Sequence, residues 1–580
     1  MSDKTVTNML NRNDNGDPLI ERFKTKIEKE KSLAFLDSFF KELPELEMYL
    51  VGGLVRDTIL KHKTPKDYDF IARGVPIAKL IKTLKKYGAV DLVGRDFGVI
   101  KFLPTDSNLT EPIDIALPRT EIAFNTGGYR DFEAQADHNL PIEDDLSRRD
   151  YTINAIAYDL KNGKIIDPFD GQKDLKNKTI RAVGNPEQRI LENYSRMLRA
   201  LRFACKLDFK IEDKTWNAIK KFMPAINDER EVNIVQSLKR KIMMESKPDK
   251  AAKLKLQLEA QIKKDPAETK MERIEPYSSI NKETLKAFAE NPARALELFE
   301  KSGALEMIMP EVLTLKNCPQ PPEFHTEGDV WQHTAMMLEK IDSKEFKVQF
   351  PKAKITGEFV LGALLHDIGK PPTLKTPEKD GTNRIRFDGH NTIGAEIAAK
   401  IGRRLELPKE TIEKWKFMVS EHMFPMTLEN IDKVGHNAIA KRFIDSAHSQ
   451  DLLMLFYLDS VCTVPKSGGP NMKKFQDMLV RIQEIKTIRA NQPEKILDGK
   501  DVIALLNVNA KTEGAFVGLI MQLATELKDK GKLNTEKEAL AFLKKQKDFL
   551  TEYKEKILTQ GKTDFHKLRE ALVDEIVKKI

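Results

Sequence analysis

The sequence predicts an α+β fold in which a mixed sheet with covering helices occupies roughly the first third of the chain and helices make up the rest. At 580 residues the chain is too long for one hydrophobic core, so about three to five domains are expected. Short apolar runs with strand character are confined to the part before about residue 180. The charged fraction of 32% and the mean hydropathy of -0.46 are typical of a helix-rich protein with large solvated faces.

The N-terminal part alternates between strands and helices. Residues 1–30 are polar and lack an apolar period, which predicts a flexible arm. Residues 31–183 follow as a head domain built from a mixed sheet with helices. Its predicted strands are the short apolar segments MYLVGG, YDFIA, VDLVG, GVIKFL and IDIAL.

The remainder of the chain is predicted to be helical. Residues 184–320 form a helical neck and body, opened by RILENYSRMLRALRFACKL. A charged segment near residues 245–280 has few residues that could build a core, and we interpret it as an insertion or as an exposed helix with a linker. The Pro-rich NCPQPPEF marks the boundary before residues 321–495, and residues 496–580 form a last helical segment.

The composition gives information on the binding partners and on the cellular compartment. The 97 Lys and Arg against 89 Asp and Glu leave a net charge of +8, which suits a polyanionic partner but is shared by many proteins without one. Cys205, Cys318 and Cys462 match no disulfide or zinc spacing, so three free thiols in a reducing compartment are expected. Because no apolar run approaches the roughly 20 residues that span a bilayer, and the polar start lacks a signal-peptide core, we expect a cytoplasmic protein without membrane contact.

The strongest local signal is LVGGLVRD followed by TPKDYDFIA. The second segment predicts a strand that carries Asp67 and Asp69, and strand alternation puts both carboxylates on one face. Two such hard anions can hold Mg²⁺ ions that bridge a nucleotide triphosphate and activate a 3′-hydroxyl for in-line attack. Gly52 and Gly53 would let backbone amides approach the phosphates without a Cβ in the way.

Three further residues near this site have alternative interpretations. Arg56 follows one helical turn after the glycine pair and is expected to neutralise phosphates, whereas Asp57 is assigned an orienting or structural role. Asp114, in PIDIAL, is a candidate third carboxylate of the metal site, although a buried or edge-strand aspartate is the competing interpretation. An isolated pair of aspartates is more often a solvated turn, but the glycine pair and the flanking strands favour a metal site.

These motifs and the ones after them resemble the DNA polymerase beta superfamily, and specifically the class II CCA-adding tRNA nucleotidyltransferases and bacterial poly(A) polymerases. EDDLSRRDYTINAIAYDL resembles the family's RRD motif, and DPFDGQKDLKNKTIRAVG its following strand and turn. RILENYSRMLRALRFACKL resembles its nucleotide-selecting helix. Four motifs in the same order are far more specific than any one of them. The resemblance implies a nucleotidyltransferase that uses Mg²⁺ in a polymerase-beta-like head.

The resemblance also assigns residues to the nucleotide pocket. Arg149 and Asp150 of RRDYTINA are placed in the pocket, with Arg148 beside them and Asn154 near the sugar or the wall of the site. Without the resemblance, the two arginines would be interpreted as surface charges and Asn154 as a hydrogen-bonding residue inside a helix.

Arg196, Arg199 and Arg202 lie three residues apart on the selecting helix. At about 100° per residue they span roughly 120° of one helix face, which predicts a basic stripe. Such a stripe is usually only a solvated face. In this helix Met197, Leu198, Leu201 and Phe203 supply an apolar side that would dock it and direct the arginines toward the cleft.

The selecting helix departs from the family at one position. The family reads the base with E-D-x-x-R, whereas Glu192, Asn193 and Arg196 spell E-N-x-x-R. An asparagine carbonyl still accepts a hydrogen bond from the exocyclic amine of cytosine or adenine, but the side chain loses the charge and gains a donor. Our hypothesis is that C and A remain accepted with altered discrimination.

A second group of candidate ligands follows residue 325. A site that combines imidazoles with carboxylates suits a divalent transition metal better than it suits Mg²⁺, which prefers ligands that are all oxygen. The segment LLHDIGK makes this region resemble an HD-type metal-dependent phosphohydrolase, with Lys370 as a phosphate contact. Histidines on apolar helices are more often core residues, and HD domains also occur as inactive scaffolds. The minimum set is His333, His366, Asp367 and Asp459, and His390 and His422 would make room for a second metal.

The leading hypothesis is a tRNA nucleotidyltransferase that completes or repairs the 3′ CCA end from CTP and ATP. The neck and the C-terminal region would grip the acceptor arm through its phosphates. One alternative is a poly(A) polymerase, since LVGRDFGVIKF partly resembles that version although Asp96 breaks the expected basic pair. Others are an enzyme that adds only CC or only A, an HD phosphohydrolase whose head merely binds nucleotides, and a non-enzymatic RNA-binding scaffold. The sequence predicts no oligomeric state.

Overall fold

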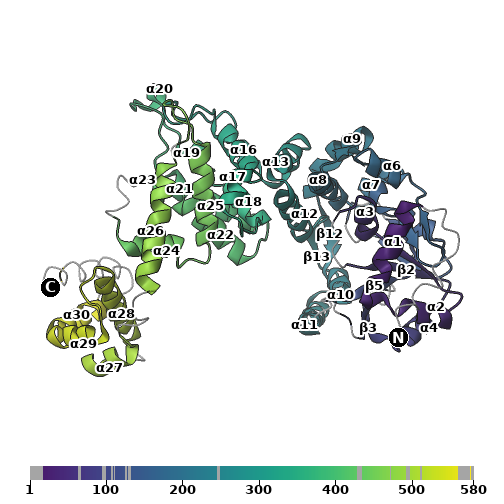
Figure 1. Ribbon diagram of the computed structural model, residues 1–580, viewed down its shortest axis with the longest axis horizontal. Coiled ribbons are helices and arrows are strands. Elements are labelled where there is room, and N and C mark those ends of the chain that lie inside the picture. The colour runs from purple at the N-terminus through teal and green to yellow at the C-terminus, as the bar shows by residue number, and fades with distance from the viewer. Residues whose placement is uncertain are drawn as a thin grey trace. The chain divides into compact units, whose positions relative to one another are not determined.

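The computed structural model describes most of the chain (Figure 1). The described residues are 17–62, 67–93, 99–105, 107, 109, 111–123, 127–128, 132–244, 248–427, 434–470, 472–490, 497–509, 513–559 and 575. They form two compact units. Unit 1 comprises residues 1–316, 338–364 and 400–412, and unit 2 comprises residues 317–337, 365–399 and 413–580.

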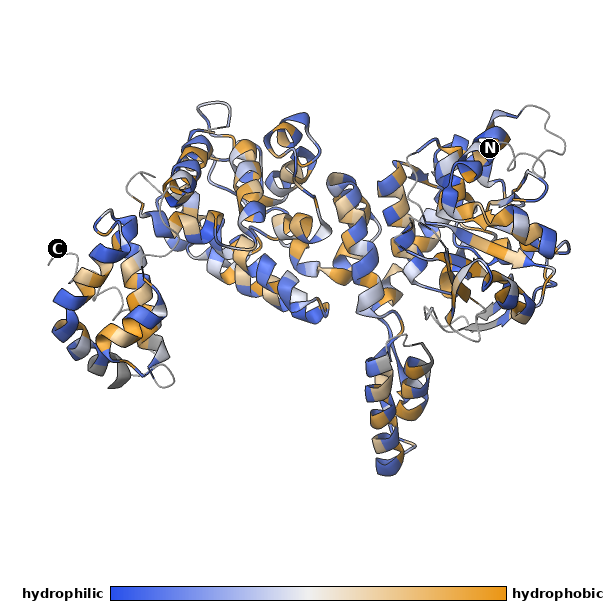
Figure 2. Cartoon of the chain, turned by 60° about the horizontal axis from the view of Figure 1, so that its bottom comes forward, coloured by the Kyte–Doolittle hydropathy of each residue, from blue (hydrophilic) through white to orange (hydrophobic). Residues whose placement is uncertain are grey.

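Unit 1 begins with a mixed seven-stranded sheet of order β3-β4-β5-β2-β1-β8-β9. Its strands are β1 (Glu47–Val51), β2 (Asp69–Arg73), β3 (Gly88–Val93), β4 (Val99–Pro104), β5 (Ile113–Ala116), β8 (Ala157–Asp159) and β9 (Lys164–Ile166). Among the described strand pairs of this sheet, β2–β5 is parallel and the others are antiparallel. Figure 2 shows apolar residues concentrated in the strands, and the polar sides of the helices around them. The predicted α+β class and all five predicted strands are confirmed.

The register of the central strands sets the position of the acidic residues. Asp69 of β2 lies opposite Asp114 of β5, and Asp114 in turn lies opposite Lys101 of β4. The prediction that one strand carries both Asp67 and Asp69 is wrong for Asp67, because β2 begins at Asp69 and Asp67 precedes it by two residues. The sheet therefore brings two carboxylates together by strand pairing, and a connecting segment supplies the third.

The expected flexible arm over residues 1–30 is wrong for its second half, because residues 18–28 form helix α1 (Pro18–Glu28). The Asp17 side chain accepts from the backbone amide of Leu19 at 2.8 Å, and Pro18 occupies the first turn, where its missing amide costs nothing. Phe23 is fully buried and stacks on Tyr158 with ring centroids 4.5 Å apart. Residues 1–16, like Asp96, lie outside the described residues.

Two helices of the neck pack against each other after the head. The first, α8 (Ser195–Leu207), buries the side that carries Met197 and Leu201. The second is α12 (Tyr277–Glu290), which also packs against α18 (Gly357–Leu364). The shorter elements of the head and the neck include α3 (Gly53–Ile59), α5 (Ile142–Ser147), α6 (Gly171–Lys176), α7 (Pro186–Leu191), β10 (Thr179–Ile180), β11 (Lys210–Ile211) and α9 (Asp213–Phe222).

The charged insertion spans residues 229–273, so it begins before the expected range of 245–280, and it is not purely helical. Strands β12 (Glu229–Asn233) and β13 (Thr269–Arg273) form an antiparallel ribbon, with Glu229 opposite Arg273. Beyond the ribbon, α10 (Ile234–Met244) and α11 (Pro248–Lys264) lie side by side as a helical hairpin (Figures 1 and 2). The prediction of an exposed helix holds for α11, but the prediction of an all-helical region after residue 183 is wrong at this ribbon.

Unit 2 is helical apart from one isolated bridge between Lys375 and Arg386 in its described residues. Its larger helices include α16 (Val330–Lys340), α21 (His390–Arg404), α22 (Lys409–Glu421), α24 (His436–Phe443), α25 (Ser449–Cys462) and α26 (Lys473–Ala490), the first three of which extend into segments of unit 1. A separate apolar core joins α27 (Gly499–Leu506), α28 (Gly514–Asp529), α29 (Glu536–Lys545) and α30 (Lys547–Thr559).

The prediction of three free thiols is confirmed, because Cys205, Cys318 and Cys462 are free and buried. Within the described part of the chain, no helix combines the length and the apolar character needed to cross a bilayer.

Candidate active site and candidate metal centre

Three carboxylates gather at one end of β2 and β5. Asp69 is half-buried beside Asp114, and Asp67 is exposed. Burial, and then the charges of Asp67 and Asp114, raise the pKa of Asp69 to about 6, while Arg149 and Lys101 act against the rise. The excess of negative charge is one that a divalent cation relieves, and carboxylate oxygens are the ligands that Mg²⁺ prefers. The cluster therefore fits the predicted cation.

Gly52 brings the backbone against this cluster. Its φ of +77° is a conformation that side chains rarely adopt, and a Cβ at this position would lie 3.3 Å from Asp69 Oδ2 and 3.7 Å from Arg149 Nη1. Gly53 opens α3 directly after it. The turn between β1 and α3 is thus close to both the carboxylates and a guanidinium, as expected for a segment that would face phosphates.

Arg56 does not face this opening, so its assignment to phosphate neutralisation is corrected. It is 3% exposed, its Nε donates to Asp57 Oδ1 at 2.7 Å and its Nη1 donates to Asn154 Oδ1 at 2.8 Å. The guanidinium carbon also lies 5.4 Å from the centroid of the Phe203 ring. Asp57 orients Arg56, and together they join α3 to the segment that contains Asn154.

Sequence reasoning missed the acid that holds the two arginines of the RRD motif. Asp145 is completely buried and pairs with Arg148 Nη2 at 2.6 Å and with Arg149 Nη2 at 3.1 Å. Although burial opposes it, these two guanidinium groups hold the pKa of Asp145 below its usual value. Arg148 also pairs with Glu121 at 2.8 Å. The spacing of three and four residues from Asp145 to the arginines was a signal that could have revealed the pairing.

Asp150 is the centre of a second buried network. Burial works against ionisation, but Arg199, whose Nη2 lies 2.5 Å away, and Asn154, whose Nδ2 donates at 3.1 Å, lower the pKa of Asp150 to about 2. Asn154, the last residue of a short 3-10 helix (Thr152–Asn154), thus bridges the nearby Asp150 and the distant Arg56. Asp150 holds Arg199 in place through a charge-assisted contact.

A polar pocket of about 290 Å³ lies beside these residues. Arg196 is fixed at its edge, because Nη1 contacts Glu192 Oε2 at 2.5 Å and the carbonyl of Arg189 at 2.8 Å, and Nη2 donates to the carbonyl of Arg148 at 3.1 Å. A guanidinium held by three acceptors has one orientation, which suits selective hydrogen bonding to a base edge. The pocket is lined by Thr120, Glu121, Asp144, Ser147, Arg148, Arg189, Glu192, Asn193 and Arg196.

Asn193 lines the pocket, but its carbonyl is already engaged. Oδ1 accepts from the backbone N of Ser195 at 2.8 Å and from Ser195 Oγ at 2.6 Å. Because a backbone amide only donates, the amide orientation is fixed, and both lone pairs of Oδ1 are used. The hypothesis that this carbonyl accepts from the exocyclic amine of a base is therefore corrected. The hydrogen-bonding capacity that Asn193 has for a base lies in its NH₂ group.

The three arginines of α8 do not form one stripe toward a common cleft. Arg196 faces the pocket, whereas Arg202 forms an ion pair with the buried Glu283 of α12 at 2.7 Å and lies 4.4 Å from the centroid of Phe203. Arg199 lies between them, paired with Asp150 and 3.8 Å from Glu283. Glu283 was missed by sequence reasoning, because nothing in its local sequence shows that its partners lie on another helix.

The histidines and acids of unit 2 gather into one buried cluster. His333 Nε2 lies 3.3 Å from Asp459 Oδ1, and Nε2 of His366 lies 3.1 Å from Asp367 Oδ2. The rings of His333 and His366 have centroids 5.7 Å apart. Burial opposes the charge on His333, but its hydrogen bonds to Asp459 and Glu327 raise the pKa of His333 to about 9.

His390 and His422 complete the cluster with facing nitrogens. Each Nδ1 contacts a backbone carbonyl, that of Phe387 at 2.9 Å and that of Val419 at 2.7 Å, so each Nδ1 carries the proton. The two Nε2 atoms are 3.2 Å apart, and both lie near Asp367 Oδ1, at 3.5 and 3.6 Å. Burial lowers the pKa of His390 to about 4, which keeps that ring neutral. Two lone pairs directed at each other beside a carboxylate fit a bound divalent cation.

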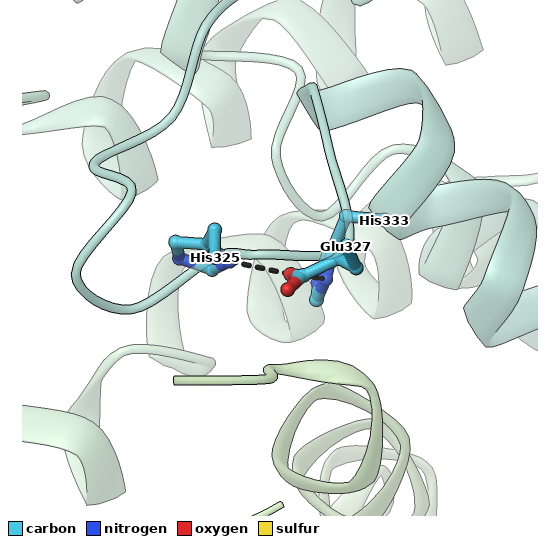
Figure 3. Close-up of side chains that lie close together, drawn as sticks. All are labelled: His325, Glu327 and His333. Carbon is cyan, nitrogen blue, oxygen red and sulfur yellow. Dashed lines mark hydrogen bonds and ion pairs between the residues drawn. The ribbon is translucent and has the colours of Figure 1, made fainter. Parts of the chain in front are cut away.

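Two residues outside the predicted ligand set belong to this centre (Figure 3). Glu327 lies between two imidazoles, with Oε1 at 3.0 Å from His333 Nδ1 and at 2.6 Å from His325 Nδ1. Its Oε2 accepts from the backbone N of Val464 at 3.1 Å. Glu327 directs the Nε2 atom of His333 toward the cluster, as an outer carboxylate does at many histidine metal sites. The spacing of FHTEGDVWQH was a signal that sequence reasoning did not use.

Lys370 contacts this cluster. It is buried, and its Nζ lies 2.7 Å from Asp367 Oδ2 and 2.7 Å from Gln320 Oε1. The ammonium group therefore fixes Asp367 within the cluster, and its role as a phosphate contact stays a prediction.

Comparisons with known proteins match both parts of the chain. The model of the poly A polymerase head domain matches residues 48–181, and the model of the HD domain matches residues 330–447. The multifunctional CCA protein of Neisseria meningitidis is 30% identical over 378 residues, 65% of this chain and 73% of that protein. The A-adding tRNA nucleotidyltransferase of Deinococcus radiodurans is 28% identical over 412 residues, 70% of this chain and 79% of that protein.

Solved structures share the fold. The CCA-adding enzyme of Bacillus stearothermophilus, solved in complex with CTP, superposes with a TM-score of 0.52 at 17% identity, over 92% of this chain and 98% of that one.

Proposed function

The chain belongs to the family of class II CCA-adding tRNA nucleotidyltransferases and bacterial poly(A) polymerases, and we propose that this nucleotidyltransferase completes or repairs the 3′ CCA end of tRNA from CTP and ATP. Relatives named for CCA addition and A addition support the RNA substrate and the two nucleotides. The observation that carries the proposal is that neighbouring arginines serve both places, because Arg148 lines the pocket of Arg196 and Arg149 lies with Asp69 at the Gly52 turn.

In this proposal the carboxylates of Asp67, Asp69 and Asp114 hold Mg²⁺, which when bound neutralises the triphosphate and lowers the pKa of the attacking 3′-hydroxyl. Arg149 lies beside the same carboxylates and contacts the phosphates. Arg196 presents a fixed pair of donors to the base, and Glu192 keeps it from rotating. Selection then depends on the protein side chains and needs no nucleic-acid template.

The test is incorporation of labelled CTP or ATP into tRNA transcripts that end at the discriminator base, at C or at CC, in the presence of Mg²⁺. Ordered addition of C, C and A followed by arrest is the expected result. A long ladder of A would identify a poly(A) polymerase, and addition of A only to the CC end would identify an A-adding enzyme. Asp69→Asn is the matched inactive variant, since it keeps the size of the side chain and removes the charge.

For the cluster of unit 2 we propose phosphohydrolase activity with a divalent transition metal. The facing Nε2 atoms of His390 and His422 beside Asp367 support it. The purified protein should contain a transition metal and hydrolyse phosphomonoesters or 2′,3′-cyclic phosphates, and His366→Ala should abolish this while nucleotide addition continues. A metal-free protein that stays inactive after incubation with Mn²⁺, Ni²⁺ or Co²⁺ would exclude the activity.

A further inference from the structure

The inserted ribbon and helical hairpin, residues 229–273, have no part in the proposed chemistry. This segment contains twelve lysines and arginines and eight aspartates and glutamates, so its net charge of +4 is half of the chain's +8. Three of the nine large apolar side chains that are exposed in the described part of the chain, Leu256, Ile262 and Met271, also lie on it. A surface with this excess of positive charge attracts polyanions such as nucleic acid.

A groove of about 910 Å³ runs between the ribbon and the start of α12, and one end of it contains Ser195 of α8. Its walls carry cations from five different elements of the fold, α8, β12, α10, β13 and α12. The cationic lining residues are Arg199, Arg230, Lys241, Lys270, Arg273 and Lys282.

The acids of the groove neutralise only part of this charge. Glu272 is shared by Lys241, at 3.1 Å, and Lys270, at 3.8 Å. Both ammonium groups keep much of their exposure, with side chains 49% and 38% accessible. Two cations that share one carboxylate leave a surplus of positive charge at the surface of the ribbon.

The opposite wall is also cationic. Lys282 is exposed on the first turns of α12. Burial, and then the charges of Arg202 and Lys282, lower the pKa of Lys286, although Glu283 acts in the opposite direction.

The groove offers little for reading bases. Tyr277 is the one aromatic residue in its described lining, and the Arg273 guanidinium carbon covers the ring at 4.1 Å from its centroid. Arg273 also contacts the Tyr277 hydroxyl at 3.3 Å. Base stacking needs an open aromatic face, so recognition in this groove would act on the phosphate backbone.

We propose that residues 229–273 form an RNA-binding arm, and that the groove between β12–β13 and α12 holds the phosphate backbone of the RNA substrate independently of its sequence. The inference rests on the proposed function, because that function supplies an RNA whose 3′ end must reach the pocket of Arg196. The geometry agrees with it, since Arg199 in the groove and Arg196 at the pocket lie one turn apart on α8.

The test uses the full chain and a tRNA transcript without its last nucleotides. Lys241, Lys270 and Lys282 are replaced together by alanine, and the matched control replaces three exposed lysines of α11 that do not line the groove, Lys253, Lys255 and Lys263. RNA affinity is measured by fluorescence anisotropy at several salt concentrations. The groove variant should bind at least about tenfold more weakly, and the slope of log affinity against log salt should become shallower by about two to three.

The control should change the affinity by less than about twofold, and the KM for ATP at saturating RNA should be the same in all three proteins. A second variant joins Glu229 to Arg273 through two glycines, which the antiparallel pairing of these residues permits, and it should bind as weakly as the groove variant.

Equal losses in the groove variant and the control, or an unchanged affinity after removal of the arm, would overturn the proposal and would point to a protein partner. The readouts separate it from the proposed function. A wild type that adds nucleotides while the groove variant binds RNA normally refutes the arm alone, whereas groove-dependent RNA binding without nucleotide addition refutes the proposed function alone.

Discussion

Replacing Glu275 by glutamine should stabilise the neck at neutral pH and leave it unchanged in acid. Glu275 is completely buried just before α12. Burial raises the pKa of Glu275 from 4.5 to about 7, and the nearby Ser279 hydroxyl and Ser195 backbone offset only part of that rise. The ionised form is thus destabilised in the folded chain.

The sign of the effect follows from proton binding. Between pH 4.5 and about 7 the folded chain holds a proton on Glu275 that the unfolded chain has lost, so the free energy of unfolding decreases as the pH rises through this window. Each pKa unit corresponds to about 1.4 kcal/mol, which gives an upper value of about 3 kcal/mol at pH 8 and nothing below pH 4.5. Glutamine has the same shape and no charge at any pH.

Hydrogen exchange of the α8 and α12 amides in the full chain, at pH 5 and at pH 8, measures this local free energy without assuming that all domains unfold together. Glu290→Gln, at an exposed position on α12, is the matched control and should show no pH-dependent difference from wild type. If Glu275→Gln differed from wild type by the same amount at both pH values, the raised pKa and the argument from burial would be refuted.

Three further outcomes follow from the sites. Because the pKa of Asp69 is raised to about 6, the affinity of the metal-free head for Mn²⁺ as a probe should fall by about tenfold for each pH unit below 6; calorimetry that shows a flat profile from pH 5 to 7 would contradict this. Glu327→Gln should weaken metal binding in unit 2 by about ten- to a hundredfold without loss of folding, since it disturbs the orientation of His333, and metal content after dialysis checks it. Asn193→Asp keeps the acceptor for the Ser195 amide but replaces the NH₂ donor by an oxygen, so CTP and ATP should gain about tenfold over UTP in kcat/KM; unchanged ratios among the nucleotides would remove Asn193 from base selection.

The sequence predicts what depends on period and motif. The strand alternation around Asp69, the apolar period of α8 and the ordered motifs were sufficient to predict the mixed sheet, the neck and the family. The Gly52 turn beside Asp69 also agrees with the expectation that the glycine pair lets the backbone come close to the site. These features are local, so the chain itself contains the signal.

What the sequence did not predict depends on partners distant along the chain. The spacing of Arg56 from the glycine pair predicts that it contacts phosphates. In the structure it lies in the interior instead, where it donates to Asn154, 98 residues away. Arg202 follows the helical period of a basic stripe, but Glu283 turns it toward α12. The orientation of a charged side chain depends on the strongest partner within its reach, and the packing of the helices determines which partner that is.

The same distant pairs explain why the base pocket can be selective. From Arg56 through Asn154 and Asp150 to Arg199 and Glu283, donors and acceptors alternate across four segments of unit 1. A buried network of this kind adds little net stability when complete, but removal of one member leaves a buried charge without its counterion, at a cost of about 3 to 5 kcal/mol. Such a network therefore permits one arrangement of α8 relative to the head. The proposed selection of bases without a template requires that restriction, because Arg196 discriminates between bases only if its own position does not adapt to each of them.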